Sequence, residues 1–151
     1  MDINTTLEAK QYVVIKIGNE QFGIDIQYVD NIVRMQRITR VPKAQSYFKG
    51  VINLRGEIIP VMCLRLKFGL APGEMTNTTR IIIIKLDQQS PIGIVVDEVK
   101  EVVTLDDSCI EKVTYHASDE KGSYLSGIGK HKDNLVSILN IAGVIIDKES
   151  I

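Results

Sequence analysis

Most of the chain consists of short runs of Val, Ile, Leu and other apolar residues, separated by Gly, Pro, Asn and charged residues. Runs of this length that are rich in β-branched residues and bounded by turn residues predict β-strands. Short helices are expected at residues 64–69 and 141–147. Many short strands divided by turns favour closed β-barrels over a parallel sheet with crossover helices. The expected strands are residues 12–17, 21–26, 29–34, 39–41, 51–54, 57–64, 80–86, 92–96, 99–105 and 135–139.

The pattern occurs twice. The segment FGIDIQYVDNIV, from Phe22, aligns with IGIVVDEVKEVV, from Ile92, at an offset of 70 residues. The segment FKGVINLRGEIIPVMCL, from Phe48, aligns with LSGIGKHKDNLVSILNI, from Leu125, at an offset of 77 residues. Two alignments in the same order indicate an internal duplication, with one barrel per copy.

The duplication suggests one domain over residues 11–146, preceded by a tail over residues 1–10. Within it we expect a first barrel at about residues 12–78 and a second at about residues 79–146. Whether the ends of the chain pack across the two barrels stays open.

The copies differ at two informative places. In the alignment, Arg55 and Gly56 correspond to Lys132 and Asp133. This difference makes the loop at residues 53–56 a candidate binding loop, although an ordinary glycine turn with a solvated Arg is an alternative explanation. Cys63 stands over Asn140, and only the asparagine can cap a helix that follows it. On this basis Cys63→Asp is expected to raise stability.

The composition narrows the class of protein. The chain has 151 residues, of which 44% are hydrophobic and 25% charged, and its net charge is −1. A nucleic-acid-binding barrel is an alternative because Arg34, Arg37 and Arg40 recur at a spacing of three, but the charge balance argues against it. The first ten residues lack the apolar core of a signal peptide, and no apolar run approaches a membrane span. A cytoplasmic protein without membrane insertion is therefore expected.

The sequence offers little for catalysis or metal binding. Two cysteines and two histidines at these spacings do not build a zinc site, and no nucleophile elbow or phosphate-binding loop occurs. The acidic pairs at residues 97–98 and 106–107 are expected to be solvated surface charges. An enzyme with a cleft between the barrels remains a further alternative, but no converging polar groups support it. We expect no catalytic residue, no cofactor and no metal, and a groove that binds a partner helix.

Four segments carry a resemblance to a known family: GIDI (23–26), FKGVINLRGEIIPV (48–61), GIVVDEV (93–99) and YLSGIG (124–129). Together they resemble the CheW family of chemotaxis coupling proteins, and the resemblance extends over nearly the whole chain. The GVINLRG segment is specific, and it also occurs in the regulatory domain of the kinase CheA and in CheV. Since this chain lacks a kinase core and a receiver domain, it is most similar to stand-alone CheW.

The resemblance implies an all-β protein of two SH3-like barrels with five strands each and with short helices. It implies a non-enzymatic adaptor without a cofactor. Its partners would be the regulatory domain of the histidine kinase CheA and the cytoplasmic tip of chemoreceptors, the methyl-accepting chemotaxis proteins. Its location would be cytoplasmic, at receptor arrays on the inner face of the membrane.

The resemblance also carries site residues over. Many relatives have Glu in a V-x-E-I motif, where this chain has Asn31, so the acid is missing there or displaced to Asp30. This puts an ion pair at that position in doubt and leaves the apolar positions as the safer part of the site. The implied receptor-binding residues are Val29, Asn31, Ile32, Arg55 and Gly56. The implied kinase-binding residues are Ile26, Asn31, Tyr115 and His116.

Overall fold

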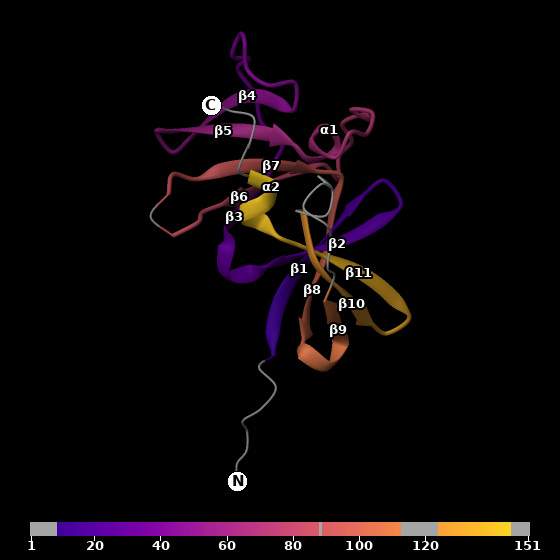
Figure 1. Ribbon diagram of the computed structural model, residues 1–151. Helices are drawn as coiled ribbons and strands as arrows, with labels where there is room; N and C mark the ends of the chain where they lie inside the picture. The colour runs from indigo at the N-terminus through magenta and orange to yellow at the C-terminus, as the bar shows by residue number, and fades with distance from the viewer. Residues whose placement is uncertain (1–8, 88, 113–123, 146–151) are drawn as a thin grey trace. The chain divides into compact units, whose positions relative to one another are not determined.

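The computed structural model describes residues 9–87, 89–112 and 124–145, and strands make up most of them (Figure 1). Two short α-helices, α1 (Leu64–Lys67) and α2 (Ile141–Ile145), and two 3-10 turns, η2 (Ile26–Tyr28) and η3 (Asp107–Cys109), complete the described elements. The strands are β1 (Lys10–Ile17), β2 (Glu20–Asp25), β3 (Val29–Arg34), β4 (Phe48–Leu54), β5 (Glu57–Cys63), β6 (Arg80–Ile84), β7 (Ile92–Val96), β8 (Glu98–Leu105), β9 (Ile110–Lys112), β10 (Leu125–His131) and β11 (Asn134–Leu139).

The chain folds into two compact units, each built on one sheet. Unit 1 takes the residues up to Ile15, then Asn19–Ile26 and the residues from Lys100 onwards; unit 2 takes Lys16–Gly18 and Gln27–Val99. The sheet of unit 2 has the order β3-β6-β7-β5-β4, and that of unit 1 has the order β8-β1-β2-β11-β10-β9. The expected all-β class is confirmed, with the short strand β9 as a sixth strand beside the five expected in unit 1.

The two units repeat one pattern of strand pairing, as the duplication predicts. In unit 2, β5 runs parallel to β7 with Val61 opposite Gly93, and in unit 1, β11 runs parallel to β2 with Ile138 opposite Gly23. These pairs are related by the two sequence offsets. The hairpins β4–β5 and β10–β11 carry a bulge at matching positions as well, between Phe48 and Gly50 and between Leu125 and Gly127. The sequence repeat is therefore a structural repeat.

The units are not consecutive halves of the chain, so the observed division differs from the one expected at residues 78 and 79. The hairpin β1–β2 pairs with β11 and β8 in unit 1, and β6–β7 pairs with β3 and β5 in unit 2. In Figure 1 the indigo strand β2 accordingly runs beside the orange strand β11. The alternation of apolar and polar residues specifies which face of a strand is buried, but not which distant strand lies beside it.

Each unit has its own apolar core, formed by the inward faces of its strands. Burial of these side chains is the main favourable contribution to folding, at about 25 cal/mol per Å² of apolar surface. Unit 1 buries Tyr12, Val14, Val103, Leu105, Val136 and Ile138 together. Unit 2 buries Ile52, Ile59, Val61, Ile81, Ile83 and Val95, and Val33, Met35, Ile38 and Leu54 pack against this cluster.

The helix caps differ between the copies as expected. Asn140 Oδ1 accepts a hydrogen bond from the Gly143 N–H at 3.3 Å at the start of α2, whereas Cys63 makes no side-chain cap at the start of α1. Cys63 is however only 3% exposed. A carboxylate at that position would lose most of its hydration, so Cys63→Asp should lower stability, contrary to the sequence-based expectation.

Neither acidic pair is simply a solvated charge. Asp97 accepts hydrogen bonds from Arg65 of α1, with Nε–Oδ1 at 2.9 Å, Nε–Oδ2 at 3.2 Å and Nη2–Oδ2 at 2.7 Å. It accepts another from the Gly18 N–H at 2.7 Å. Asp106 caps η3 by accepting a hydrogen bond from the Ser108 N–H at 2.9 Å. Both carboxylates therefore have structural roles that adjacency in the sequence did not reveal, because their partners are set by tertiary structure in one case and by local turn geometry in the other.

Candidate protein-docking surface

Strand β3 is an edge strand of unit 2 and alternates between half-buried and exposed side chains. Val29, Asn31 and Val33 are half-buried, while Asp30, Ile32 and the last residue of the strand are exposed. Ile32 is 38% exposed, which is a large value for an isoleucine in a strand. The outer face of β3 thus presents one apolar side chain between two charged ones.

A β-bulge at the start of β3 sets the direction of Asp30. Val29 pairs with Ile84 and Asn31 with Ile83, so Asp30 is an extra residue on β3 that faces no partner on β6. Bulges bend a strand locally and redirect a side chain. Asp30 is therefore an exposed carboxylate at this edge of the sheet.

Asn31 directs its side chain to its own backbone. Its Oδ1 accepts a hydrogen bond from the Ile32 N–H at 2.9 Å. An amide is neutral and partly engaged in this way, so it does not replace the carboxylate of the V-x-E-I motif. The nearest exposed acid in the strand is Asp30.

An open cavity of about 500 Å³ lies beside the start of β3. The Lys85 N–H donates to the Tyr28 carbonyl oxygen at 2.9 Å and holds the end of β6 against this segment. The cavity is lined by Gln27, Tyr28, Val29, Asp30, Lys85, Leu86 and Asp87. Its lining mixes apolar and charged side chains, as protein-binding surfaces do.

The turn between β4 and β5 presents Arg55. Arg55 has φ 55° and Gly56 has φ 86°, and the Gly56 N–H donates to Asn53 Oδ1 at 3.0 Å. Lys132, the equivalent residue of unit 1, has φ 56°. Both copies thus hold this residue in the left-handed region, Arg in one and Lys in the other. The next residue differs, because Gly56 has a positive φ and its equivalent, Asp133, does not.

The strand register places Arg55 and the start of β3 at the same end of the unit 2 sheet. Val29 pairs with Ile84, which in turn pairs with Ile92, the first residue of β7. Strand β5 runs parallel to β7 with Val61 opposite Gly93, so its earlier residues and the turn before it extend beyond Ile92. Figure 1 shows the β4–β5 turn and the β6–β7 connection on the same side.

Ile58, which sequence reasoning did not select, belongs to this end of the sheet. It lies three residues after Arg55 and is 60% exposed, while the next residue, Ile59, is buried. The duplicate residue Leu135 is 67% exposed. A signal was present in the sequence, because Ile58 and Ile59 are adjacent on one strand and only one of them can face the core.

Of the remaining candidate residues, only Ile26 lies in the part of the chain that the structure describes. Ile26 is 37% exposed and counts with unit 1. Tyr115 and His116 lie outside the described residues.

The described part of the chain contains neither a cluster of metal ligands nor a helix that could span a membrane. Within residues 9–87, 89–112 and 124–145, no group of three or more His, Cys, Asp or Glu side chains could hold a metal ion. None of the helices in those ranges is long and apolar enough to cross a membrane.

Comparisons with a protein family, with known relatives and with a solved structure all relate this chain to CheW proteins. Residues 11–149 match the CheW-like domain. The chain is 34% identical to a chemotaxis protein CheW of Bacillus subtilis, covering 93% of this chain and 89% of that protein. It is also 34% identical to a chemotaxis protein CheW of Helicobacter pylori, covering 91% of this chain and 82% of that one.

A solved structure agrees with the fold. The scaffolding protein TtCheW from Thermoanaerobacter tengcongensis is similar with a TM-score of 0.82 and 30% identity, over 98% of this chain and 95% of that protein. A match of this extent covers both units. The chain belongs to the CheW-like domain family.

Proposed function

We propose that this protein is a non-enzymatic chemotaxis adaptor that binds the regulatory domain of the histidine kinase CheA and the cytoplasmic tip of chemoreceptors. The observation that carries the proposal is the family match over residues 11–149, together with relatives named as chemotaxis proteins CheW. In this role the chain works in the cytoplasm at receptor arrays, on the inner face of the membrane. Its output is the effective concentration of one partner near the other.

We assign receptor binding to the end of unit 2 that carries Val29, Asn31, Ile32, Arg55 and Gly56. Ile32 and Ile58 supply exposed apolar area there, and Arg55 supplies a cation on a rigid turn. Such a surface suits a helix with an apolar stripe and a carboxylate, because Arg binds carboxylates through paired hydrogen bonds. Asp30, and not Asn31, is the residue available for an ion pair with a partner cation.

We assign kinase binding to a surface that includes Ile26, Asn31, Tyr115 and His116. Exposure of Ile26 supports its part in this surface, because an exposed apolar side chain gains most from burial against a partner. The resemblance to the family is the support for the other residues.

Arg55→Glu tests the receptor surface. A turn side chain adds little to the core, so we expect an unchanged fold and receptor binding weaker by about tenfold or more, which corresponds to about 1.4 kcal/mol. Co-sedimentation with receptor-tip and kinase fragments measures both interactions.

Lys132→Glu is the matched control, because Lys132 is a cation at the equivalent turn position of unit 1, with φ 56° against 55° for Arg55. It should leave receptor binding intact. Equal losses in the two variants, or no loss in Arg55→Glu, would remove Arg55 from the proposed surface. Failure of the unchanged protein to bind either fragment would contradict the adaptor role itself.

A further inference from the structure

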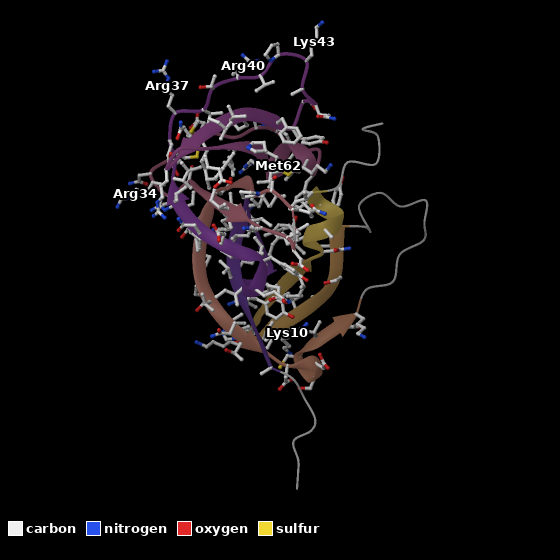
Figure 2. The ribbon with its side chains drawn as sticks, turned by 90° about the vertical axis from the view of Figure 1, so that its left-hand side faces the viewer. Lys10, Arg34, Arg37, Arg40, Lys43 and Met62 are labelled. Atoms are coloured by element: carbon white, nitrogen blue, oxygen red, sulfur yellow. The ribbon has the colours of Figure 1, made fainter. Side chains whose placement is uncertain are left out.

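Positive charge is concentrated in one segment of a chain that is nearly neutral. Residues 31–56 contain no Asp or Glu and carry a charge of +6, whereas the whole chain carries −1, so the other residues together carry −7. Figure 2 shows four of these cations along the end of β3 and the connection from β3 to β4. They are Arg34, Arg37, Arg40 and Lys43.

Backbone hydrogen bonds hold this connection on the sheet near both of its ends, one of them from the Cys63 N–H to the Tyr47 carbonyl oxygen at 2.7 Å. Thr39 and Val51 exchange two backbone hydrogen bonds of 2.8 Å, and the Phe48 N–H donates to the Gln45 carbonyl oxygen at 3.0 Å. Gly50 has φ 141°, and a Cβ on it would lie 2.0 Å from the Thr39 oxygen. Only glycine therefore permits Thr39 to approach β4 so closely, and the loop that follows Thr39 has a defined path.

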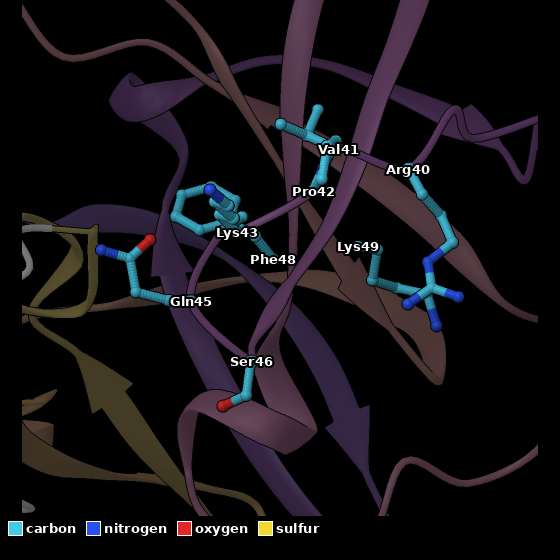
Figure 3. A pocket seen from close by; sticks show the side chains of 9 residues that line it. Arg40, Val41, Pro42, Lys43, Gln45, Ser46, Phe48 and Lys49 are labelled. Carbon is cyan, nitrogen blue, oxygen red and sulfur yellow. The ribbon is translucent and has the colours of Figure 1, made fainter.

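The loop and β4 enclose an open cavity of about 350 Å³ (Figure 3). Val41, Pro42 and Phe48 supply its apolar part, and Val41 is 47% exposed. Arg40, Lys43 and Lys49 supply three cations, and Gln45 and Ser46 supply polar groups. The lining contains no carboxylate. In Figure 3, Arg40 and Lys49 extend to one side and Gln45 to the other.

We propose that this cavity, the basic pocket of residues 40–49, is a docking site for an extended acidic peptide segment of a partner protein. Its cations match peptide carboxylates, and Arg40 can bind one through two parallel hydrogen bonds. Val41, Pro42 and Phe48 accept an apolar side chain placed between the acids. Charge complementarity of this kind raises association rates and selects partners.

A peptide fits the pocket better than a nucleic acid does. Nucleic-acid binding by small barrels uses aromatic side chains on which successive bases stack, as well as cations. Phe48 is the one aromatic residue that lines this pocket, and it is only partly exposed. The pocket therefore combines charges with an aliphatic surface and offers no stacking platform.

The basic pocket is distinct from the surface around Arg55 and Ile32. Phe48 pairs with Met62 near the end of β5, whereas the Arg55 turn precedes the start of β5. The two features thus lie at opposite ends of the β4–β5 hairpin. Binding at one can be tested without disturbing the other.

The test is fluorescence anisotropy with a short fluorescein-labelled peptide of Glu residues and interspersed Leu, using the full chain. The variant replaces three pocket cations together: Arg40→Gln, Lys43→Gln and Lys49→Gln. The matched control makes the same charge change with three exposed cations of unit 1: Lys100→Gln, Lys112→Gln and Lys130→Gln. One exposed ion pair changes a binding affinity by about 1.4- to 5-fold, so we expect the pocket variant to bind the peptide about tenfold more weakly. The control variant should lose less than about twofold in affinity. The Gln analogue of the peptide should not bind, and Arg55→Glu should leave peptide binding unchanged.

Three results would overturn the proposal. The first is an equal loss in the pocket variant and the control, which would mean general attraction to positive charge. The second is equal binding of the Glu peptide and its Gln analogue. The third is a single-stranded oligonucleotide that binds more tightly than the peptide and depends on the same three cations. Thermal unfolding of each variant separates loss of the site from loss of the fold. Receptor co-sedimentation should stay unchanged in the pocket variant. The test of the pocket is therefore independent of the proposed adaptor function.

Discussion

Asp97→Asn should reveal how much the contacts of one carboxylate stabilise unit 2. Asp97 connects two parts of unit 2, because it accepts hydrogen bonds from Arg65 of helix α1 and from the Gly18 N–H at 2.7 Å. The side chains of Arg65 and Asp97 retain 24% and 32% of their exposure, so the pair is partly shielded from water. Asparagine has nearly the same shape but places an amide group where one of the hydrogen-bond-accepting oxygens was.

The expected loss follows from the geometry of the pair. A fully exposed ion pair contributes about 0–1 kcal/mol, and a hydrogen bond to a charged group contributes about 1.5–3 kcal/mol. The asparagine side chain can still accept the bond from the Gly18 N–H, but it loses the charge and one of the Arg65 bonds. We expect the free energy of unfolding to fall by about 1–2 kcal/mol. For a chain of this size, that lowers the melting temperature by about 2–8 °C.

The loss should depend on pH in a defined direction. Hydrogen bonds from Arg65 hold the pKa of Asp97 below its ordinary value. Partial burial acts in the opposite direction, and the hydrogen bond from the Gly18 N–H lowers the pKa further. A carboxyl with a lowered folded-state pKa stabilises the fold above its unfolded pKa of about 3.9, and this contribution disappears as the pH falls through the folded-state pKa. The difference between the unchanged protein and Asp97→Asn should therefore be full at neutral pH and shrink in acid.

Urea unfolding followed by circular dichroism at neutral and acidic pH measures both effects. Asp133→Asn is the control, because it makes the same chemical change at an exposed turn position. A loss in Asp97→Asn no larger than in Asp133→Asn would refute the reasoning. So would a difference that remains undiminished in acid. A double-mutant cycle with Arg65→Gln gives the coupling energy of the pair directly.

Further predictions concern the backbone and the helix caps. Gly50→Ala should destabilise unit 2 and displace the loop after Thr39, because the alanine Cβ would lie 2.0 Å from the Thr39 oxygen. Denaturant unfolding measures the stability, and peptide anisotropy measures binding at the basic pocket. Unchanged values in both assays would contradict this prediction. Asn140→Ala should lower the free energy of unfolding by about 0.5–2 kcal/mol in urea unfolding through loss of the bond to the Gly143 N–H, nearer the lower value at 3.3 Å. Cys63→Asp should destabilise because Cys63 is 3% exposed, and a rise in melting temperature would show that the carboxylate reaches water.

The candidate surface was partly predictable from the sequence. Arg55 lies in a turn and Ile32 on a strand, and the resemblance to the family points to both residues without knowledge of the fold. Ile58 was missed because the resemblance did not include it and because an adjacent isoleucine hid the outward-facing one. The role of Asp97 was missed because its partners, Arg65 and Gly18, are 32 and 79 residues away in the sequence.

The strands, the duplication and the lack of a basic balance over the whole chain can all be read from residue order, because each depends on local residue types or on direct comparison of segments. The assignment of β1–β2 to β10–β11, and of β6–β7 to β3, β4 and β5, emerges only in the folded chain. The reason is that strand pairing over long sequence separations depends on the simultaneous packing of all inward faces, which alternation along one strand does not encode. The exposure of individual side chains also depends on the tertiary structure. Ile58, for example, lies at the surface because neighbouring residues such as Ile59 fill the core.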